Sequence, residues 1–149
     1  MTGVCSTPNV DLVRSLGADH VIDYKREDFT RSGRRYDLII DNVGNRSLLA
    51  CRGAMGPNAR LVVVGAPDGR WVAPVARVVA AKLLSQFGSR KFVPHLTDTT
   101  QADLVYLKEL IEAGTVSPVI DRRYSLSEAP DAIRYLETMR ARGKVIIAM

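Results

Sequence analysis

Two apolar runs without polar alternation constrain the fold of this chain more than any other feature. They are residues 36–41 (YDLIID) and 60–65 (RLVVVG). A strand with one face in solvent alternates apolar and polar residues, whereas a parallel strand covered by helices on both faces does not. The segment between the runs, residues 46–55, has helical periodicity. We therefore predict an α/β fold with a parallel sheet flanked by helices.

The rest of the chain continues this alternation of strands and helices. Pro94 has no N–H for a strand ladder, which places its strand at a sheet edge. Thr100 and Asp103 have the spacing of a helix capping box, and Gly114 is suited to end that helix. We expect one structural unit without a linker. Further strands are predicted at residues 2–6, 20–23, 91–96, 116–120 and 144–148, and helices at residues 10–16, 27–30 (one turn), 74–87 (largely buried), 100–113 and 127–140.

The composition limits the classes of protein to which the chain can belong. Its 149 residues are 46% hydrophobic and 25% charged, which is typical of a single globular domain. No apolar stretch approaches the roughly 20 residues that cross a bilayer, and residues 1–20 lack the features of a signal peptide, so we expect a cytoplasmic location. The net charge of +5 comes from basic residues spread along the chain, a pattern that argues against a nucleic-acid-binding surface.

Neither metal ligation nor nucleophilic catalysis is indicated by the sequence. Cys5 and Cys51 are far apart, and we interpret both as small buried apolar residues rather than as nucleophiles, ligands or a disulfide. His20 and His95 stand alone, without other histidines, cysteines or carboxylates at metal-ligand spacing. We therefore predict no metal site and no Ser/His/Asp or Cys/His catalytic set.

Four motifs, in this order, carry a resemblance to a known family. They are GVCSTPNVDLVRSLGADHVIDY (residues 3–24), YDLIIDNVGN (36–45), LVVVGAP (61–67) and LKELIEAGTVSPVIDRRYSLSEAPDAIRYLETMRARGKVII (107–147). The ordered set resembles the medium-chain dehydrogenase/reductase superfamily, in particular its quinone-oxidoreductase and alcohol-dehydrogenase-like branch. This resemblance covers nearly the whole chain. It implies that residues 1–149 are part of a Rossmann-type NAD(P)-binding domain, in which residues from about 117 to 149 form the family's C-terminal returning segment.

The resemblance also implies that the centre of the sheet is missing. The first residues correspond to the second strand of such a domain, and the sequence contains no Gly-x-Gly-x-x-Gly turn to hold a cofactor pyrophosphate. In the usual strand order 3-2-1-4-5-6 the first strand is central. The strands at residues 2–6 and 36–41 are therefore expected to lose their common neighbour, each keeping a row of unpaired backbone groups. We expect the isolated chain to be compromised unless the rest is supplied elsewhere, or unless the chain oligomerises or exchanges strands.

By resemblance, the cofactor contacts lie at the carboxyl ends of the strands. Ser6 and Thr7 end the first strand without an acidic residue for the adenosine ribose, so we expect NADP(H) in preference to NAD(H). The alternative is that Ser6 or Thr7 caps the next helix. Lys25 and Arg26 are basic residues that either reach a phosphate or are solvated. The other candidate cofactor-binding residues are Tyr24, Asn42, Gly44, Val64, Gly65, Ala66, Phe87 and Lys144, each with ordinary packing or a surface turn as its alternative.

The implied function is hydride transfer between a nicotinamide cofactor and a carbonyl, quinone or alcohol. The chain would be the C-terminal portion of an NADP(H)-dependent oxidoreductase and inactive alone. None of the named residues is a general acid or base, because the cofactor carries the chemistry. The alternative is a non-catalytic oligomerisation or regulatory remnant, with residues 91–96 as the candidate homo-oligomer interface. A third hypothesis, that the chain keeps a weak nucleotide site and catalyses reduction alone, is least favoured because the pyrophosphate donors are missing.

Overall fold

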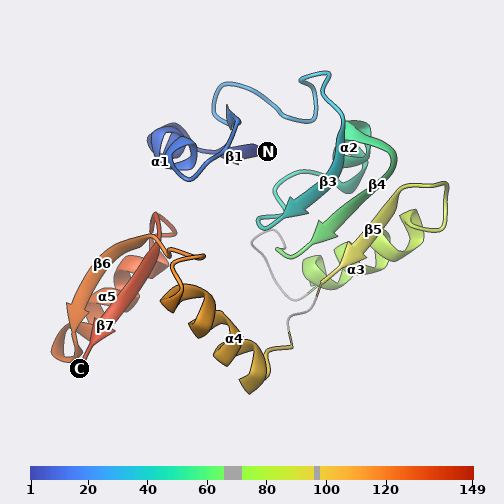
Figure 1. The fold of residues 1–149 in the computed structure, drawn as a ribbon. Helices are drawn as coiled ribbons and strands as arrows, with labels where there is room; N and C mark the ends of the chain where they lie inside the picture. The colour runs from blue at the N-terminus through green and yellow to red at the C-terminus, as the bar shows by residue number, and fades with distance from the viewer. Residues whose placement is uncertain (66–71, 96–97) are drawn as a thin grey trace. The chain divides into compact units, whose positions relative to one another are not determined.

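The computed structural model describes residues 1–65, 72–95 and 98–149, and the chain divides into two compact units, Met1–Thr97 and Asp98–Met149. All strand pairs are parallel, which confirms the predicted α/β class. The first unit contains β1 (Thr2–Cys5), the short 3-10 helix η1 (Thr7–Asn9), α1 (Val10–Ser15), β2 (His20–Asp23), β3 (Tyr36–Asp41), α2 (Leu48–Ala54), β4 (Met55–Val63), α3 (Val72–Leu84) and β5 (Lys91–Pro94) (Figure 1). The second contains α4 (Gln101–Glu112), β6 (Ile120–Ser125), η2 (Leu126–Glu128), α5 (Ala129–Glu137) and β7 (Lys144–Ala148).

The strands of the first unit form two separate sheets instead of one continuous sheet. β1 pairs with β2, and β3, β4 and β5 form a three-stranded sheet in that order. Among the described strands, β1 has no partner except β2, and β3 has none except β4. The expected loss of a common neighbour between the strands at residues 2–6 and 36–41 is therefore confirmed.

Helices α2 and α3 both pack on one face of the β3–β4–β5 sheet. Leu61 of β4 and Phe92 of β5 are partners in the ladder and are 0% and 3% exposed on that face. Cys51 of α2 and Ala81 of α3 complete the same buried cluster, and Ile39 of β3 packs against it. Removal of this apolar surface from water is the main favourable contribution to the stability of the unit.

The other face of this sheet carries exposed apolar side chains. Leu38 and Ile40 of β3 are 55% and 60% exposed, and Val93 of β5 is 41% exposed. The prediction that residues 36–41 are buried on both faces is therefore wrong. The apolar run formed a strand as expected, but both helices that follow it pack on the side of Ile39, so the side of Leu38 and Ile40 is left uncovered.

Two predicted elements are absent because local hydrogen bonds compete with them. Residues 27–30 form turns and not a helical turn, since Asp28 accepts hydrogen bonds from the amide and the hydroxyl of Thr30. Residues 116–120 do not form the predicted strand, since the amides of Thr115 and Val116 donate to the Leu110 carbonyl at the end of α4. The strand instead begins at Ile120 and runs through a polar sequence.

The helices lie close to the positions predicted from the sequence, but several side chains on them are more exposed than predicted. In α4 the predicted capping box of Thr100 and Asp103 is present, and Gly114 follows with a φ of 70°. Helix α3 is not buried all round, because Val75 and Val79 are 61% and 51% exposed. In α5 only Ala132 is buried, whereas the apolar Ile133 and Leu136 are exposed, as is Met139 after the helix. No helix in the described ranges is long and apolar enough to cross a membrane.

Strand β5 lies at the sheet edge, as Pro94 predicted, and this edge is protected. The outward-facing amide and carbonyl of Phe92 are both bonded to the Ser85 hydroxyl, at 2.7 and 2.8 Å. Pro94 itself has no N–H, and such features block pairing with another chain. Association through residues 91–96 stays a prediction that must rest on side chains, and Leu96 lies outside the described residues.

We predict that Leu61→Ala lowers the free energy of unfolding by about 2–5 kcal/mol, because it removes a fully buried side chain from a packed cluster. Leu49→Ala, on α2 of the same unit, is the matched control, since Leu49 is 67% exposed and its truncation is expected to change stability by less than about 0.5 kcal/mol. Urea denaturation monitored by circular dichroism measures both. Equal effects of the two substitutions would contradict the assigned core.

Candidate functional site

The turn that follows β3 is organised around Asp41. One carboxylate oxygen, Oδ1, accepts a 2.8 Å hydrogen bond from the amide of Gly44, whose φ of 74° suits glycine. The other, Oδ2, forms an ion pair with Arg77 of α3, and the two side chains are only 13% and 9% exposed. Arg77 also donates from Nη1 to the Arg46 carbonyl at 2.9 Å. These bonds fix the path of the chain through Asn42, which lies between Asp41 and Gly44.

Sequence reasoning missed Arg77. The available signal was a single arginine inside an apolar helical stretch, residues 74–81 (PVARVVAA). Because an isolated buried charge is costly, such an arginine indicates a carboxylate partner. The sequence does not say which of the chain's acidic residues that partner is, since Asp41 lies 36 positions away.

The turn that follows β4 lies directly against the turn that follows β3. The amides of Val64 and Gly65 both donate to the Asp41 carbonyl at 3.0 Å. A Cβ atom on Gly65 would overlap the carbonyl group of Asn42, so only glycine allows this approach. The structure thus brings together four of the predicted site residues, Asn42, Gly44, Val64 and Gly65. Ala66, predicted with them, lies outside the described residues.

A second group of predicted residues lies at the carboxyl ends of β1 and β2. The Thr7 hydroxyl donates to Asp23 Oδ2 at 2.6 Å, the Lys25 amide donates to Oδ1 at 3.0 Å, and Arg26 Nε is 3.6 Å from Oδ2. The hydrogen bond from Thr7 is the largest cause that lowers the pKa of Asp23. The Ser6 side chain forms no capping bond to η1, so the helix-capping alternative is not observed for it.

A cavity of about 390 Å³ lies between the β1–β2 sheet and β3, inside the first unit. Tyr24 and Asn42, one from each group of candidate residues, both line it. Phe29 lines it from the connection between β2 and β3. The other predicted residues of the two groups, Ser6, Thr7, Gly44, Val64 and Gly65, do not line it.

Phe87, a further candidate in the first unit, does not line this cavity. The carbonyl of Phe87 accepts a 3.1 Å hydrogen bond from Arg52, and the residue is 65% exposed. Lys144 belongs to the second unit, where its amide donates to the Val119 carbonyl at 2.7 Å. Their predicted roles stay predictions.

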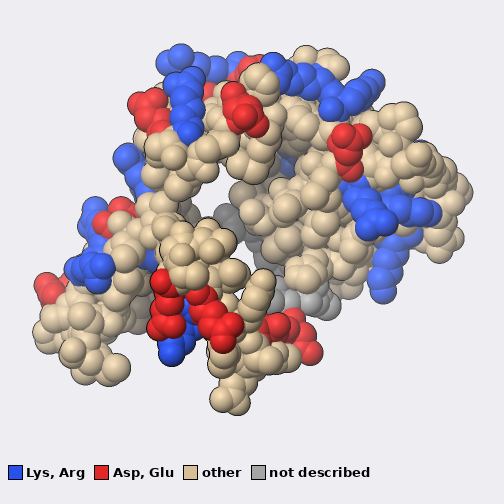
Figure 2. All heavy atoms as spheres, in the orientation of Figure 1, with Lys and Arg blue, Asp and Glu red and all other residues tan. Residues whose placement is uncertain are grey.

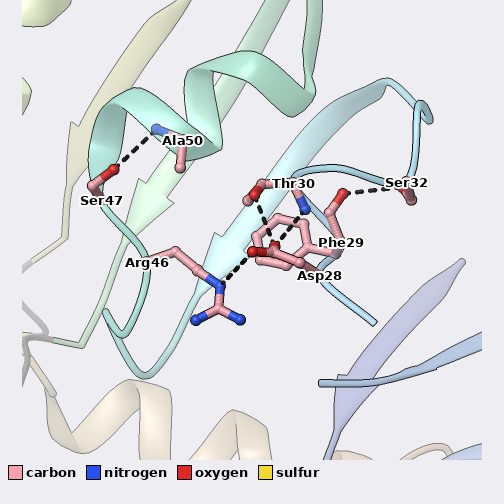
Figure 3. A network of polar contacts seen from close by, with 7 residues as sticks. All are labelled: Asp28, Phe29, Thr30, Ser32, Arg46, Ser47 and Ala50. Atoms are coloured by element: carbon pink, nitrogen blue, oxygen red, sulfur yellow. Dashed lines mark hydrogen bonds and ion pairs between the residues drawn. The ribbon is translucent and has the colours of Figure 1, made fainter. Parts of the chain in front are cut away.

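The connection between β2 and β3 is held against the start of α2 by a polar network (Figure 3). Asp28 forms an ion pair with Arg46 at 3.3 Å and accepts from the amide and hydroxyl of Thr30 at 3.0 and 2.8 Å. Ser47 caps α2 by accepting from the Ala50 amide at 3.1 Å. The network fixes the segment that carries Phe29. Lys and Arg side chains gather on the outer surface of the same connection, as the upper part of Figure 2 shows.

The described residues do not offer a metal site or an activated thiol. No group of three His, Cys, Asp or Glu residues lies close enough to hold an ion within the described ranges. Burial raises the pKa of Cys51 to about 11, with a smaller contribution from Asp41, so this thiol stays protonated at neutral pH. Cys51 is buried as predicted, whereas Cys5 is only partly buried.

Comparison with known proteins places this geometry in a family. A family model described as zinc-binding dehydrogenase matches residues 16–147. A trans-enoyl reductase of Aspergillus terreus is 35% identical over 158 residues, covering 99% of this chain and 44% of the reductase. A mitochondrial NAD(P)H oxidoreductase of Homo sapiens is 34% identical over 168 residues, covering 99% of this chain and 41% of that protein. The chain therefore spans less than half the length of these curated relatives.

A solved structure supports the same assignment. The quinone oxidoreductase from Coxiella burnetii matches 99% of this chain and 44% of its own length, with a TM-score of 0.78 and 26% sequence identity. The resemblance to medium-chain dehydrogenases and reductases, and the Rossmann-like α/β class, are thereby confirmed.

We predict that Gly65→Ala displaces the turn at Asn42 and lowers the free energy of unfolding by about 1–3 kcal/mol, because the new methyl group has no space. The matched control is Gly53→Ala inside α2, where no atom lies within 4 Å of the added Cβ. This control is expected to raise stability by about 0.5–1 kcal/mol through helix propensity. Urea denaturation and the amide NMR shift of Asn42 give the two readouts. A neutral Gly65→Ala variant would contradict the close contact.

The Asp28 network predicts a pH-dependent contribution to stability. The hydrogen bonds from Thr30, with a smaller effect of Arg46, lower the pKa of Asp28 in the folded state. The stabilisation is therefore present above the unfolded value of about 3.9 and is lost as the pH falls through the lower folded value. We expect Asp28→Asn to destabilise the chain at pH 7 and to make less difference at pH 3. The same loss at both pH values, measured by thermal unfolding, would contradict the role of the ionised carboxylate.

Proposed function

The chain belongs to the zinc-binding dehydrogenase family, and on this premise we propose that it is the C-terminal portion of an NADP(H)-dependent oxidoreductase. The reaction class is hydride transfer of the quinone or carbonyl reductase or alcohol dehydrogenase type. One observation carries the proposal: the turns after β3 and β4 meet at Asn42 and Gly65 so closely that a side chain at residue 65 is excluded. In open parallel sheets, ligands bind outside the carboxyl ends of the strands, where these turns lie.

The proposed role of these residues is to bind and orient the cofactor. The cofactor supplies the hydride, and the protein determines where its reactive ring lies. The side-chain amide of Asn42 is suited to hydrogen-bond the nicotinamide ribose. Gly44 is buried and Gly65 packs against the Asn42 carbonyl, so their proposed role is to shape the turns, while the exposed Val64 adds an apolar contact. The buried Asp41–Arg77 pair acts indirectly, by holding the turn in one conformation.

A preference for NADP(H) is supported by the charges at the ends of β1 and β2. The ribose 2′-phosphate is an anion that favours hydroxyl donors and basic residues. Ser6 supplies a hydroxyl without a capping bond, and Lys25 and Arg26 supply positive charge. Asp23 is the opposing charge, but it is already engaged by Thr7, by the Lys25 amide and by Arg26.

We propose that the chain does not transfer hydride by itself. A dinucleotide pyrophosphate rests on the backbone N–H groups of a glycine-rich turn at a helix N-terminus. The sequence contains no such turn, and so the two ends of the cofactor would bind without their connecting phosphates being held. The zinc implied by the family description does not fit the described donor atoms, so no step is assigned to a metal.

The test separates the 2′-phosphate site from the missing pyrophosphate site. Titration of the 15N-labelled chain with 2′-AMP is expected to shift the amides of Ser6, Thr7 and Lys25, with about tenfold tighter binding than 5′-AMP (about 1.4 kcal/mol). Ser6→Asp is expected to abolish this preference by repulsion. Ser127→Asp, which places the same charge on the exposed surface of the second unit, should leave this preference unchanged.

A separate assay tests activity: the unmodified chain should not consume NADPH with menadione as acceptor. Equal binding of the two nucleotides would contradict the NADP(H) preference, and turnover would contradict inactivity.

A further inference from the structure

We propose that the connection between β2 and β3, residues 24–35, is a docking surface for an anionic lipid membrane. The connection lies on the outside of the first unit, where Lys and Arg side chains gather (Figure 2). Binding of this kind is electrostatic and takes place at the level of the lipid headgroups. It uses no bound cofactor, so the inference does not depend on the proposed oxidoreductase function.

The connection carries a large share of the positive charge of the chain. Residues 25–35 (KREDFTRSGRR) include five basic and two acidic residues, a net charge of +3. The net charge of all 149 residues is +5. Basic residues occur along the whole chain, but this short segment concentrates them. A surface region with charges of one sign attracts partners of the opposite sign.

The positive charges of the connection are exposed and mostly without carboxylate partners. Arg31, Arg34 and Arg35 are exposed, and none of their side chains forms an ion pair within the part of the chain that the structure describes. Asp28 does not neutralise them, because it pairs with Arg46 of a different segment. Neighbouring like charges repel, so this arrangement costs stability. A local cost without a compensating contact is expected at a functional surface.

Hydrogen bonds hold the backbone of the connection in one conformation. The Arg31 amide donates to the Asp28 carbonyl at 2.9 Å. The Ser32 hydroxyl donates to the Phe29 carbonyl at 3.0 Å and accepts from the Arg34 amide at 3.4 Å. Phe29 itself packs against the buried cluster of the β3–β4–β5 sheet. The arginines therefore extend from a fixed backbone, and a partner has to order only their side chains.

The scarcity of exposed apolar side chains argues against a protein or a single-stranded nucleic acid as the partner. Protein interfaces are centred on buried apolar and aromatic side chains, and single strands bind by stacking their bases on aromatic rings. In the connection, Tyr24 is 39% exposed and is covered by Lys25, whose Nζ lies 5.5 Å from the ring centroid. Phe29 packs inward, so the connection offers neither an apolar centre nor a free row of rings.

A lipid surface fits these features better. Four of the five basic residues of the connection are arginines, and the guanidinium group binds phosphate oxygens through two parallel hydrogen bonds. Lipids diffuse within the bilayer, so their phosphates can move to the positions that the arginines set. A duplex nucleic acid is read by a helix or a strand ribbon in its groove, whereas the connection consists of turns and bends. Clusters of four to eight Lys and Arg residues are typical of surfaces that bind anionic lipids.

Sedimentation with lipid vesicles tests the proposal directly. The probe is a vesicle of phosphatidylcholine with about 30% phosphatidylglycerol, which supplies the anionic headgroups. We expect the chain to sediment with these vesicles and to stay in solution with vesicles of phosphatidylcholine alone. Raising the salt concentration from about 0.05 M to about 0.5 M is expected to release the chain, because salt screens exposed charges.

A charge-neutralised variant locates the binding surface. The combined substitution Arg31→Gln, Arg34→Gln and Arg35→Gln is expected to weaken vesicle binding about a hundredfold, since each arginine contributes about fivefold (about 1 kcal/mol). These side chains form no ion pair within the described ranges, so the variant is expected to fold, which circular dichroism verifies. None of the three is a proposed cofactor-binding residue. The preference for 2′-AMP over 5′-AMP should therefore be unchanged.

A matched control separates this surface from the net charge of the chain. Lys82→Gln, Arg123→Gln and Arg140→Gln together remove the same charge from exposed positions outside the connection. Vesicle binding by this control is expected to weaken less than about threefold, because screening limits the reach of distant charges.

Four results would overturn the proposal. The first is no binding to the anionic vesicles at low salt, and the second is equal binding to vesicles of phosphatidylcholine alone. The third is equal weakening by the control variant, which would assign the effect to net charge. The fourth is release of the chain from the vesicles by duplex DNA at equal phosphate concentration, which would identify a nucleic acid as the partner. Vesicle binding is measured without nucleotide, so failure here is distinguishable from failure of the proposed oxidoreductase function.

Discussion

The requirement that strand backbone groups find hydrogen-bond partners on both edges governs the first unit. β4 meets this requirement through β3 and β5, and it carries the most buried side chains of the unit, including Leu61. β5 meets it through the Ser85 hydroxyl and through Pro94. β1 and β3 do not meet it on the edges that face the cavity, and the apolar side chains beside those edges are exposed for the same reason. Incomplete pairing and incomplete burial are therefore two consequences of one gap in the sheet.

Asp41 is the residue through which the candidate site depends on the fold. Its carbonyl accepts from the amides of Val64 and Gly65, which joins the ends of β3 and β4. Its carboxylate accepts from Gly44 and pairs with Arg77, which joins the turn to α3. A carboxylate with few exposed atoms is costly unless all its acceptors are used, and here both oxygens have a donor. We infer that Asp41 stabilises the turn that presents Asn42 and is not itself available to a ligand.

The sequence predicted what depends on local pattern and failed where the result depends on distant neighbours. The apolar runs at residues 36–41 and 60–65, Pro94 at an edge and the Thr100 capping box are local signals, and all are present in the structure. The strand at Ile120–Ser125 was missed because its sequence, IDRRYS, is polar. The exposure of Ile40 was missed because burial depends on what covers a strand. The partners Asp41 and Arg77 are joined only by tertiary packing, which no spacing rule encodes.

The incomplete sheet and the candidate cofactor site are physically coupled. Asn42 directly follows β3, and both Asn42 and Tyr24 line the cavity between β1 and β3. Ile40 lies two residues before Asn42, and Val4 lies two residues before Ser6. Whatever restricts the motion of β1 and β3 therefore also restricts the two turns at which the cofactor is proposed to bind. Binding to an already ordered site costs less conformational entropy, so the order of these two strands contributes to the affinity of the proposed site.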